Sequence, residues 1–290
     1  MNIRQPSRAG SFYEDTAASC RHHAERLIES ADVPADLPQK LYGGLVPHAG
    51  WAYSGKLAAL TLKALLGAAT RATVVVFGAD HVGTAHKGEV FDSGVWQTPM
   101  GQVQVDEEVA KALLEHNDLL RANPAAHARE HSIEVQVPLL QTLLSDVKIV
   151  PIEVPPTEMA VEIGESVGKR LADLYPHAIL VGSTDLTHHG GHFPSPGGHG
   201  QEGVKWSREN DQRMLNLIER MKAHAVILEA QAHGNACGAG AIAATIAACN
   251  VLGAKKGVVL QYTNSYEVSH ALYPQESDDT TVGYASVVFA

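Results

Sequence analysis

Two histidines and one cysteine stand in segments that suit metal binding. His48 lies in the run LVPHAGW and His81 in FGADHVG, each after an apolar stretch typical of a strand. Cys237 lies in GNACGAG, where a glycine-rich turn is expected to open a buried helix. Two imidazoles and one thiolate would hold a metal ion through three ligands and leave positions open for substrate. The sequence therefore predicts a metal site assembled from distant parts of the chain.

Cys237 differs from the other two cysteines in its setting. Backbone N–H groups and the dipole of a helix N-terminus favour a thiolate. A thiolate there could be a metal ligand, a nucleophile or a redox thiol, and two nearby histidines make the ligand the leading interpretation. Cys20 and Cys249 fit small apolar core residues instead, and Cys249 lies too far along the expected helix to share an ion with Cys237.

Two further segments hold candidate acid–base residues. Asp185 and His188 follow an expected strand three residues apart, and a carboxylate so placed could fix the tautomer of a general base. His131 and Glu134 open an expected helix, where a spacing of three puts both on one face. Two interpretations of this pair stay open: a capping cluster, or side chains that orient a metal-bound imidazole or a proton donor.

The rest of the chain must position these residues, and its pattern is α/β. Apolar runs alternate with helical patterns, which predicts one domain over residues 1–290, with a central mixed, largely parallel sheet flanked by helices. Strands are expected over residues 41–46, 72–77, 148–154, 178–182, 258–262 and 282–289, and a hairpin over 89–106. Helices are expected over residues 54–68, 106–117, 133–144, 158–174, 206–220 and 238–252. The glycine-rich run 190–203 is expected to be a loop that could cover the site.

In open α/β sheets, ligands bind at the edge where the parallel strands end. His48, His81 and the segment 183–189 each fall just past such an end. A lone histidine in that place would most simply be a hydrogen-bonded structural residue. Three equivalent positions favour a shared polar site.

The composition of the chain argues against several classes of function. The net charge is −10 and no block of Lys or Arg occurs, which argues against nucleic-acid binding and against an anionic membrane surface. The first residues lack the apolar core of a signal peptide, and the longest apolar run, 239–252, is too short to span a bilayer. Three cysteines form no disulfide framework, so we expect a cytoplasmic protein.

Taken together, the motifs resemble the Memo family, whose fold is related to the class III extradiol dioxygenases. The resemblance runs nearly from end to end. It rests on RQPSRAGSFY at 4–13, PHAGWAYSG at 47–55, GADH at 78–81, EHSIE at 130–134, STD at 183–185 with His188, and CG at 237–238.

The resemblance implies roles for individual residues. In the related dioxygenases two histidines and a glutamate bind Fe(II), and a further histidine acts as acid–base. His48 and His81 match the two histidine ligands, Cys237 replaces the glutamate, and His188 matches the acid–base residue. Prokaryotic members are often associated with a radical SAM protein and an AMMECR1-domain protein, which suggests a shared pathway.

Three functions follow from these observations. The favoured one is an Fe(II)-dependent oxidoreductase that acts on a small molecule with dioxygen. Because a soft thiolate shifts metal preference toward Cu(I) or Zn(II), a zinc hydrolase with Glu134 or His188 as base is a second possibility. The third is a non-catalytic module that binds a metal or a peptide.

Overall fold

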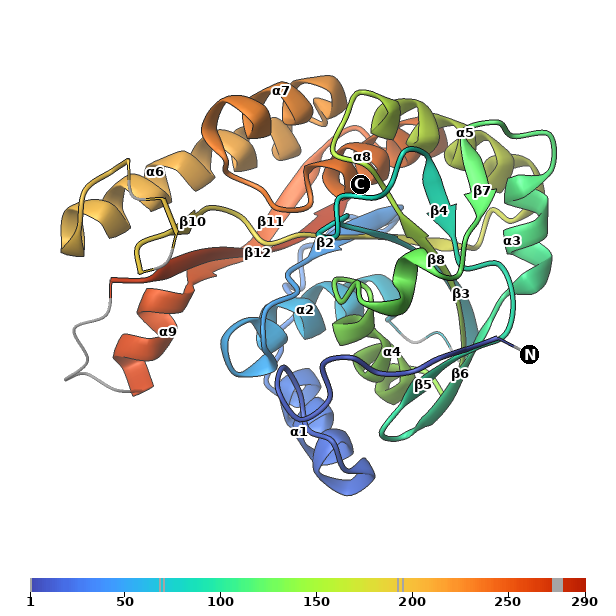
Figure 1. Cartoon of the computed structure of the whole chain (residues 1–290), viewed down its shortest axis with the longest axis horizontal. Helices are drawn as coiled ribbons and strands as arrows, with labels where there is room; N and C mark the ends of the chain where they lie inside the picture. The colour runs from blue at the N-terminus through green and yellow to red at the C-terminus, as the bar shows by residue number, and fades with distance from the viewer. Residues whose placement is uncertain (1, 68, 70, 192, 195, 273–278) are drawn as a thin grey trace.

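The computed structural model describes residues 2–67, 69, 71–191, 193–194, 196–272 and 279–290 (Figure 1). Its strands join into one mixed sheet. In spatial order the main path runs β1 (Ile3–Arg4), β5 (Val95–Thr98), β6 (Gly101–Val105), β8 (Asp146–Glu153), β3 (Arg71–Gly78), β9 (Ile179–Ser183), β2 (Gly43–Val46), β12 (Thr281–Phe289) and β10 (His188–His189). Off this path, β11 (Gly257–Asn264) pairs with β12, and β4 (Gly88–Val90) pairs with β7 (Leu120–Ala122) and with β8.

The centre of the sheet is parallel. Strands β6, β8, β3, β9 and β2 pair with one another in parallel, whereas β12 runs antiparallel to β2, β10 and β11. Parallel strands share a direction, so β2, β3, β8 and β9 all end at one edge of the sheet. This confirms the predicted α/β architecture with a mixed, largely parallel central sheet.

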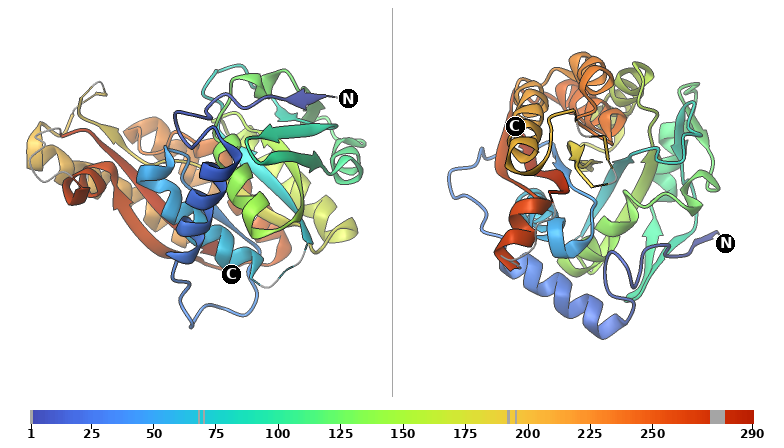
Figure 2. Two further views of the ribbon diagram at one scale, coloured as in Figure 1. Left: turned by 90° about the horizontal axis from the view of Figure 1, so that it is seen from below. Right: turned by 60° about the vertical axis from the view of Figure 1, so that its left-hand side comes forward.

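Helices cover both faces of the sheet, as the views in Figures 1 and 2 show. One face carries α5 (Met159–Leu174), α6 (Gly200–Glu219), α7 (Ala223–His233) and α8 (Ala239–Leu252). The other carries α1 (Ala17–Glu29), α2 (Trp51–Leu66), α4 (Val137–Leu143) and α9 (Ser265–Leu272). Helix α3 (Glu107–Leu114) contacts β7, β8 and α5.

Burial on both faces explains the apolar strands. Val74 to Phe77 of β3 are completely buried, because helices cover the sheet on either side. On one side α8 lies tightly against α5, and a Cβ atom added at Gly164 would come within 2.2 Å of the Ala244 carbonyl oxygen. Small residues at this crossing therefore let two helix backbones approach each other closely.

Most elements that the sequence predicts are present, with ends shifted by a few residues. The helix expected over 133–144 is different: residues 132–133 form a turn, Glu134–Gln136 is a short 3-10 turn, and α4 begins only at Val137. The expected loop 190–203 is shorter, because α6 begins at Gly200. Residue 68 at the expected end of one helix, and residues 192 and 195 of the loop, lie outside the described residues.

Two other expectations can be compared with the fold. No helix in the described part of the chain is both long and apolar enough to cross a membrane. Cys20 on α1 and Cys249 on α8 are free, and neither is exposed to solvent. Both cysteines therefore lie in the core, as the sequence predicts.

Candidate metal centre

The parallel strands bring the predicted site residues to one edge. His48 follows the end of β2, His81 follows β3, and Asp185 follows β9. Val46 at the end of β2 is in register with Ser183 at the end of β9, which places the two following loops side by side. Cys237 reaches the same edge from the turn that precedes α8. The tertiary structure thus joins residues almost 190 positions apart.

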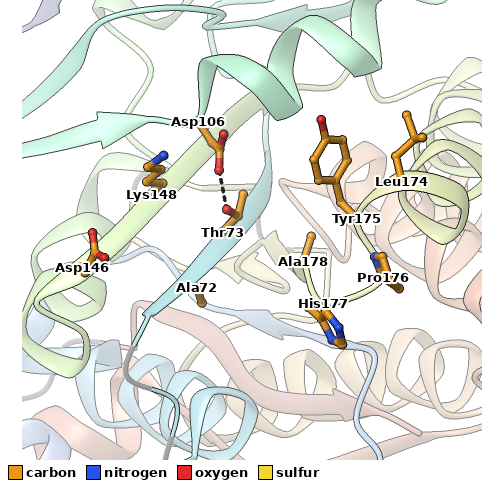
Figure 3. A pocket seen from close by; sticks show the side chains of 10 residues that line it. All are labelled: Ala72, Thr73, Asp106, Asp146, Lys148, Leu174, Tyr175, Pro176, His177 and Ala178. Carbon is orange, nitrogen blue, oxygen red and sulfur yellow. Dashed lines mark hydrogen bonds between the residues drawn. The ribbon is translucent and has the colours of Figure 1, made fainter.

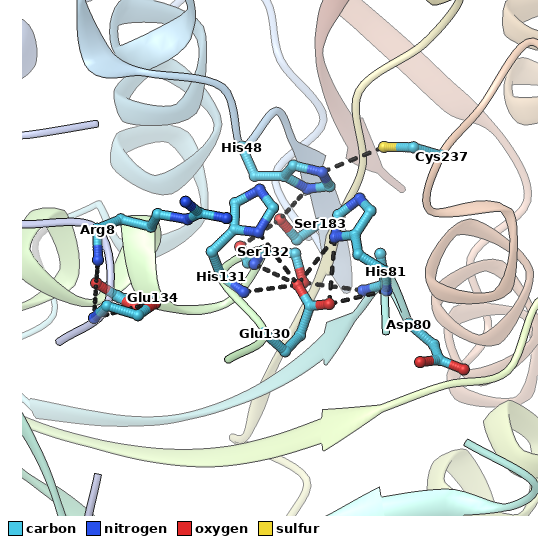
Figure 4. Close-up of polar contacts among 12 residues, drawn as sticks. Arg8, His48, Asp80, His81, Glu130, His131, Ser132, Glu134, Ser183 and Cys237 are labelled. Carbon is cyan, nitrogen blue, oxygen red and sulfur yellow. Dashed lines mark hydrogen bonds and ion pairs between the residues drawn. The ribbon is translucent and has the colours of Figure 1, made fainter. Parts of the chain in front are cut away.

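His48, His81 and Cys237 form a compact group of potential ligands (Figure 4). The nearest ligand atoms of the three side chains all lie within 4.8 Å of one another. His48 Nε2 is 3.2 Å from Cys237 Sγ. His48 is buried, whereas the His81 side chain keeps 30% of its exposure, so the group is open to solvent on the His81 side. This spacing suits three ligands of one ion.

A hydrogen-bond chain fixes the tautomer of His48. Ser183 Oγ donates to the Ser132 carbonyl oxygen at 2.7 Å, which uses its only proton. The same oxygen lies 3.0 Å from His48 Nδ1, so it must accept a proton from that nitrogen. His48 Nε2, which faces Cys237, is then unprotonated and able to bind a metal.

His81 is oriented by a carboxylate in the same manner. Its Nδ1 lies 3.0 Å from Glu130 Oε1, and the Glu130 side chain is almost completely buried. Glu130 also accepts hydrogen bonds from the main-chain N–H groups of His81, His131 and Ser132. Donation from Nδ1 to Glu130 directs His81 Nε2 toward the other candidate ligands, an arrangement that is common in histidine–metal sites.

His131 lies beside the two histidine ligands. Its ring stacks on His81 with centroids 4.7 Å apart, and it meets His48 edge-on at 5.5 Å. His81, Glu130 and His131 form a second group whose ligand atoms lie within 4.8 Å of one another. His131 therefore lies at the centre, as the sequence predicts, although its partner there is Glu130 and not Glu134.

The electrostatics of the group differ from residue to residue. Burial, together with the neighbouring His81 and His131, holds the pKa of His48 well below its usual value, so its imidazole stays neutral. Burial also opposes the charged form of His81. Hydrogen bonds to Cys237 and Glu130 outweigh this burial and raise the pKa of His81 to about 10. Without a metal, His81 therefore carries a proton that an incoming cation must displace.

Cys237 does not gain a low thiol pKa from its helix position. Burial raises the pKa of the Cys237 thiol, and the hydrogen bond with His81 offsets this only in part. In the metal-free chain, burial thus favours the neutral thiol of Cys237, whereas a helix N-terminus is expected to favour the thiolate. A bound cation supplies the charge that stabilises a thiolate in such a place.

Asp185 contacts His48 and Cys237 rather than His188. Its Oδ1 accepts a hydrogen bond from the His48 main-chain N–H at 2.7 Å. Its main chain pairs with Cys237, since the Cys237 N–H lies 3.2 Å from the Asp185 carbonyl oxygen. Burial raises the Asp185 pKa to about 7. The predicted contact between Asp185 and the His188 ring is absent from the described residues, because the Asp185 carboxylate turns toward the loop after β2.

His188 lies near the cluster without a polar partner on one nitrogen. Its Nε2 is buried and has no hydrogen-bond partner among the described residues. Its ring packs on Phe193, with centroids 4.9 Å apart. Burial, aided by the charge of His81, lowers the His188 pKa to about 4, so the ring is neutral near pH 7. Neither candidate ligand group contains His188.

Glu134 lies in a different environment from the one predicted. Its carboxylate pairs with buried Arg4 and accepts hydrogen bonds from Ser7, from the Arg8 main-chain N–H and from Tyr13. These contacts fasten the N-terminal segment to the turn before α4. The expected helix is interrupted at residues 131–136, and the Glu134 carboxylate pairs with the N-terminal segment rather than with the His131 ring. Neither predicted interpretation of this pair describes Glu134.

Sequence reasoning did not single out Glu130 or Ser183 as parts of the centre. Both act on the ligand histidines through hydrogen bonds. A signal for Glu130 was present, since it directly precedes His131 in the motif EHSIE. Ser183 lies in the segment 183–189 that was expected at the shared edge, but its contact with His48 could not be predicted, because that contact exists only where β2 and β9 are neighbours.

A separate pocket of about 430 Å³ lies at the opposite edge of the sheet (Figure 3). Thr73 and Lys148 near the starts of β3 and β8 line it, together with Asp106 and Tyr175. None of the predicted site residues lines this pocket. The predicted site residues therefore lie away from this pocket.

The donors present fit a transition metal. Two imidazole nitrogens are directed inward by Ser183 and Glu130, and one sulfur lies beside them. This N₂S set suits zinc, copper or iron better than the hard cations Mg²⁺ or Ca²⁺. The structure therefore supports metal binding by His48, His81 and Cys237, without identifying the metal.

Comparison with known proteins agrees with these motifs. The model of the family described as Memo-like protein matches residues 4–288. A MEMO1 family protein of Methanopyrus kandleri is 32% identical, with 99% of this chain and 98% of the relative covered. One from Thermococcus onnurineus is 33% identical, with 99% of both chains covered. Because the match extends over almost the whole chain, this protein belongs to the Memo family.

Proposed function

We propose that this protein binds one transition-metal ion through His48, His81 and Cys237 and works as a metal-dependent oxidoreductase on a small molecule. The observation that supports it is the pair of imidazoles whose Nδ1 atoms are held by Ser183 and Glu130, so that both Nε2 atoms can bind a metal. Fe(II) is the favoured metal. Bound there, it would supply Lewis acidity and one-electron chemistry with dioxygen.

Residues of the chain have separate tasks in this proposal. Glu130 and Ser183 orient the ligands, and Asp185 holds the main chain of both His48 and Cys237. His188 is the proton carrier: it is neutral near pH 7, and its buried Nε2 has no partner in the described chain. A neutral imidazole can accept a proton from a substrate hydroxyl and later return it.

The sulfur ligand favours a second candidate function. A thiolate prefers Cu(I) and Zn(II), so the centre could hold either metal without turnover. Zinc hydrolysis is a weaker candidate, since Glu134, one of the two bases predicted for it, is bound to Arg4. Association with an AMMECR1-domain protein and a radical SAM protein stays a prediction.

Metal content tests the site directly. We expect protein purified without oxygen to hold about one metal ion per chain, because two imidazoles and one thiolate that suit the same class of metal lie close together. His48→Ala, His81→Ala and Cys237→Ser should lose most of it, while Cys249→Ala, a buried cysteine outside the cluster, should keep it. Elemental analysis with circular dichroism as a check of folding decides this. Full metal content in all three folded variants would refute the site.

Turnover separates the candidate functions. Iron together with oxygen uptake on catechols supports the oxidoreductase, whereas tight Cu(I) binding without turnover supports the second candidate.

His188→Ala should keep its metal and lose about 10²- to 10⁴-fold in rate, because the proton carrier is gone. His189→Ala is the matched control, since the His189 Nε2 pairs with the Gly198 carbonyl oxygen. A His188→Ala protein with normal turnover contradicts the assigned role.

A further inference from the structure

Arg8 places a positive charge beside the metal centre and forms no ion pair with the described part of the chain. Figure 4 shows the Arg8 side chain extending toward His131, away from Glu134. The contact between Arg8 and Glu134 is made by the Arg8 main-chain N–H, 2.8 Å from Glu134 Oε1. Glu134 therefore anchors the backbone of Arg8 and leaves its guanidinium free to face the cluster.

One nitrogen of the Arg8 guanidinium lacks an acceptor among the residues that the structure describes. Its Nε is buried without a hydrogen-bond partner, and the side chain forms no ion pair within the described residues. Buried donors in native proteins almost always have a partner, and each exception requires an explanation. A guanidinium is a planar donor that fits a carboxylate in bidentate fashion. An anion bound beside Arg8 would give its unpartnered Nε an acceptor.

Aromatic rings connect Arg8 to the ligand histidines. The Arg8 guanidinium carbon lies 5.1 Å from the Phe12 ring centroid, and the Phe12 ring meets His131 edge-on at 5.1 Å. His131 in turn stacks on His81 at 4.7 Å. Burial is the main cause of the low His131 pKa, about 4, and the charge of Arg8 contributes to it. Arg8 and the metal ligands therefore border the same region.

The charges of the chain make Arg8 the group that an anionic ligand would contact at this centre. The chain carries a net charge of −10, which opposes the approach of an anion. The carboxylates nearest to this region are already engaged: Glu130 by His81 and main-chain N–H groups, and Glu134 by Arg4. Arg8 is thus a cation whose charge is not neutralised by a neighbouring side chain.

We propose that Arg8 binds a carboxylate of the substrate, so that the substrate class of this centre is a small organic acid. This rests on the proposed function, because it takes the metal centre as the reacting end. Arg8 would hold one end of the molecule by paired hydrogen bonds while the other end faces His48, His81 and Cys237. Arg8 is a specificity-determining residue in this proposal and takes no part in proton transfer.

The test compares binding of acids and their neutral amides. The probes are 2,3- and 3,4-dihydroxybenzoate and the two matching dihydroxybenzamides, titrated calorimetrically into zinc-loaded protein, so that no turnover occurs. We expect at least one acid to bind about 10- to 100-fold more tightly than its amide, as for a hydrogen-bonded charged group. Equal affinity for both acids and both amides overturns the proposal, as does an absence of binding by all four.

Substitutions assign the preference to Arg8. Arg8→Gln should abolish it, and Arg8→Lys should restore part of it, since a lysine keeps the charge but loses the planar fork. Arg220→Gln removes an exposed charge at the end of α6 and should change nothing. A preference that survives in Arg8→Gln overturns the proposal. Because Arg8 is not a metal ligand, a weaker preference for the acids over the amides should persist in metal-free protein. A failure of the proposed metal site can therefore be told apart from a failure of the proposed role of Arg8.

Discussion

Glu130 and Glu134 are four residues apart and both are buried, yet they belong to different regions of the molecule. Glu130 orients His81 and accepts main-chain N–H groups at the metal centre. Glu134 pairs with Arg4 and fastens residues 4–13 to the turn before α4. The same side-chain type thus serves chemistry in one place and attachment in the other. What differs is the set of donors that the fold brings to each carboxylate.

The electrostatics of the two carboxylates follow the same division. Burial raises the pKa of each, but neighbouring positive charge and hydrogen bonds together lower it below the usual value in both cases. For Glu130 the opposing partners are His81 and main-chain N–H groups. For Glu134 they are Arg4 and Ser7. Both carboxylates are therefore ionised at neutral pH, and removing the charge has different consequences in the two regions.

The largest effect is expected on stability. Glu134→Gln leaves the guanidinium of Arg4 buried without its counter-charge, which costs about 3–5 kcal/mol in the free energy of unfolding. Urea denaturation of metal-free protein at pH 7 measures this. Glu25→Gln, on the exposed side of α1, is the control and should be neutral. A loss no greater than that of the control would mean that Glu134 does not fasten the N-terminal segment.

A smaller effect is expected on metal affinity. Glu130→Gln removes the charge that orients His81, and loss of such a partner typically weakens metal binding about 10- to 100-fold. Competition with a chelator of known affinity measures it, and folded Glu134→Gln is the matched control that should keep its affinity. If Glu134→Gln weakens metal binding as much as Glu130→Gln does, the division between the two regions is wrong.

The smallest expected effect is a change in how the stability of the fold depends on pH in acid when Glu134 is replaced. Because the Glu134 pKa is lower in the folded chain, its ionised form stabilises the fold above the ordinary pKa of 4.5. That contribution is lost as pH falls through the folded pKa. The stability gap between wild type and Glu134→Gln should therefore be full above about pH 5.5 and narrow toward pH 3. Unfolding curves across this range measure the gap, and a gap that widens on acidification contradicts the assignment.

The sequence alone predicted the parts of this protein that depend on local pattern. Apolar runs such as Val74 to Phe77 indicated buried strands, and their alternation with helices indicated a sheet covered on both faces. The strand-end positions of His48 and His81 then indicated a common edge, since parallel strands end together. The prediction of one shared site needed only the order of elements and the direction of the chain.

Only the tertiary structure decided how the buried polar groups are paired. A turn at residues 132–133 and a 3-10 turn stand where the spacing of His131 and Glu134 predicted a helix, and Glu134 pairs with Arg4 instead of the centre. Asp185 turned to the His48 main chain, and Ser183 reached the His48 ring, because β2 and β9 are neighbours in the sheet. Apolar burial has no direction, so its pattern can be detected in a sequence. A hydrogen bond requires a donor and an acceptor about 3 Å apart, and that distance is set only when the chain has folded.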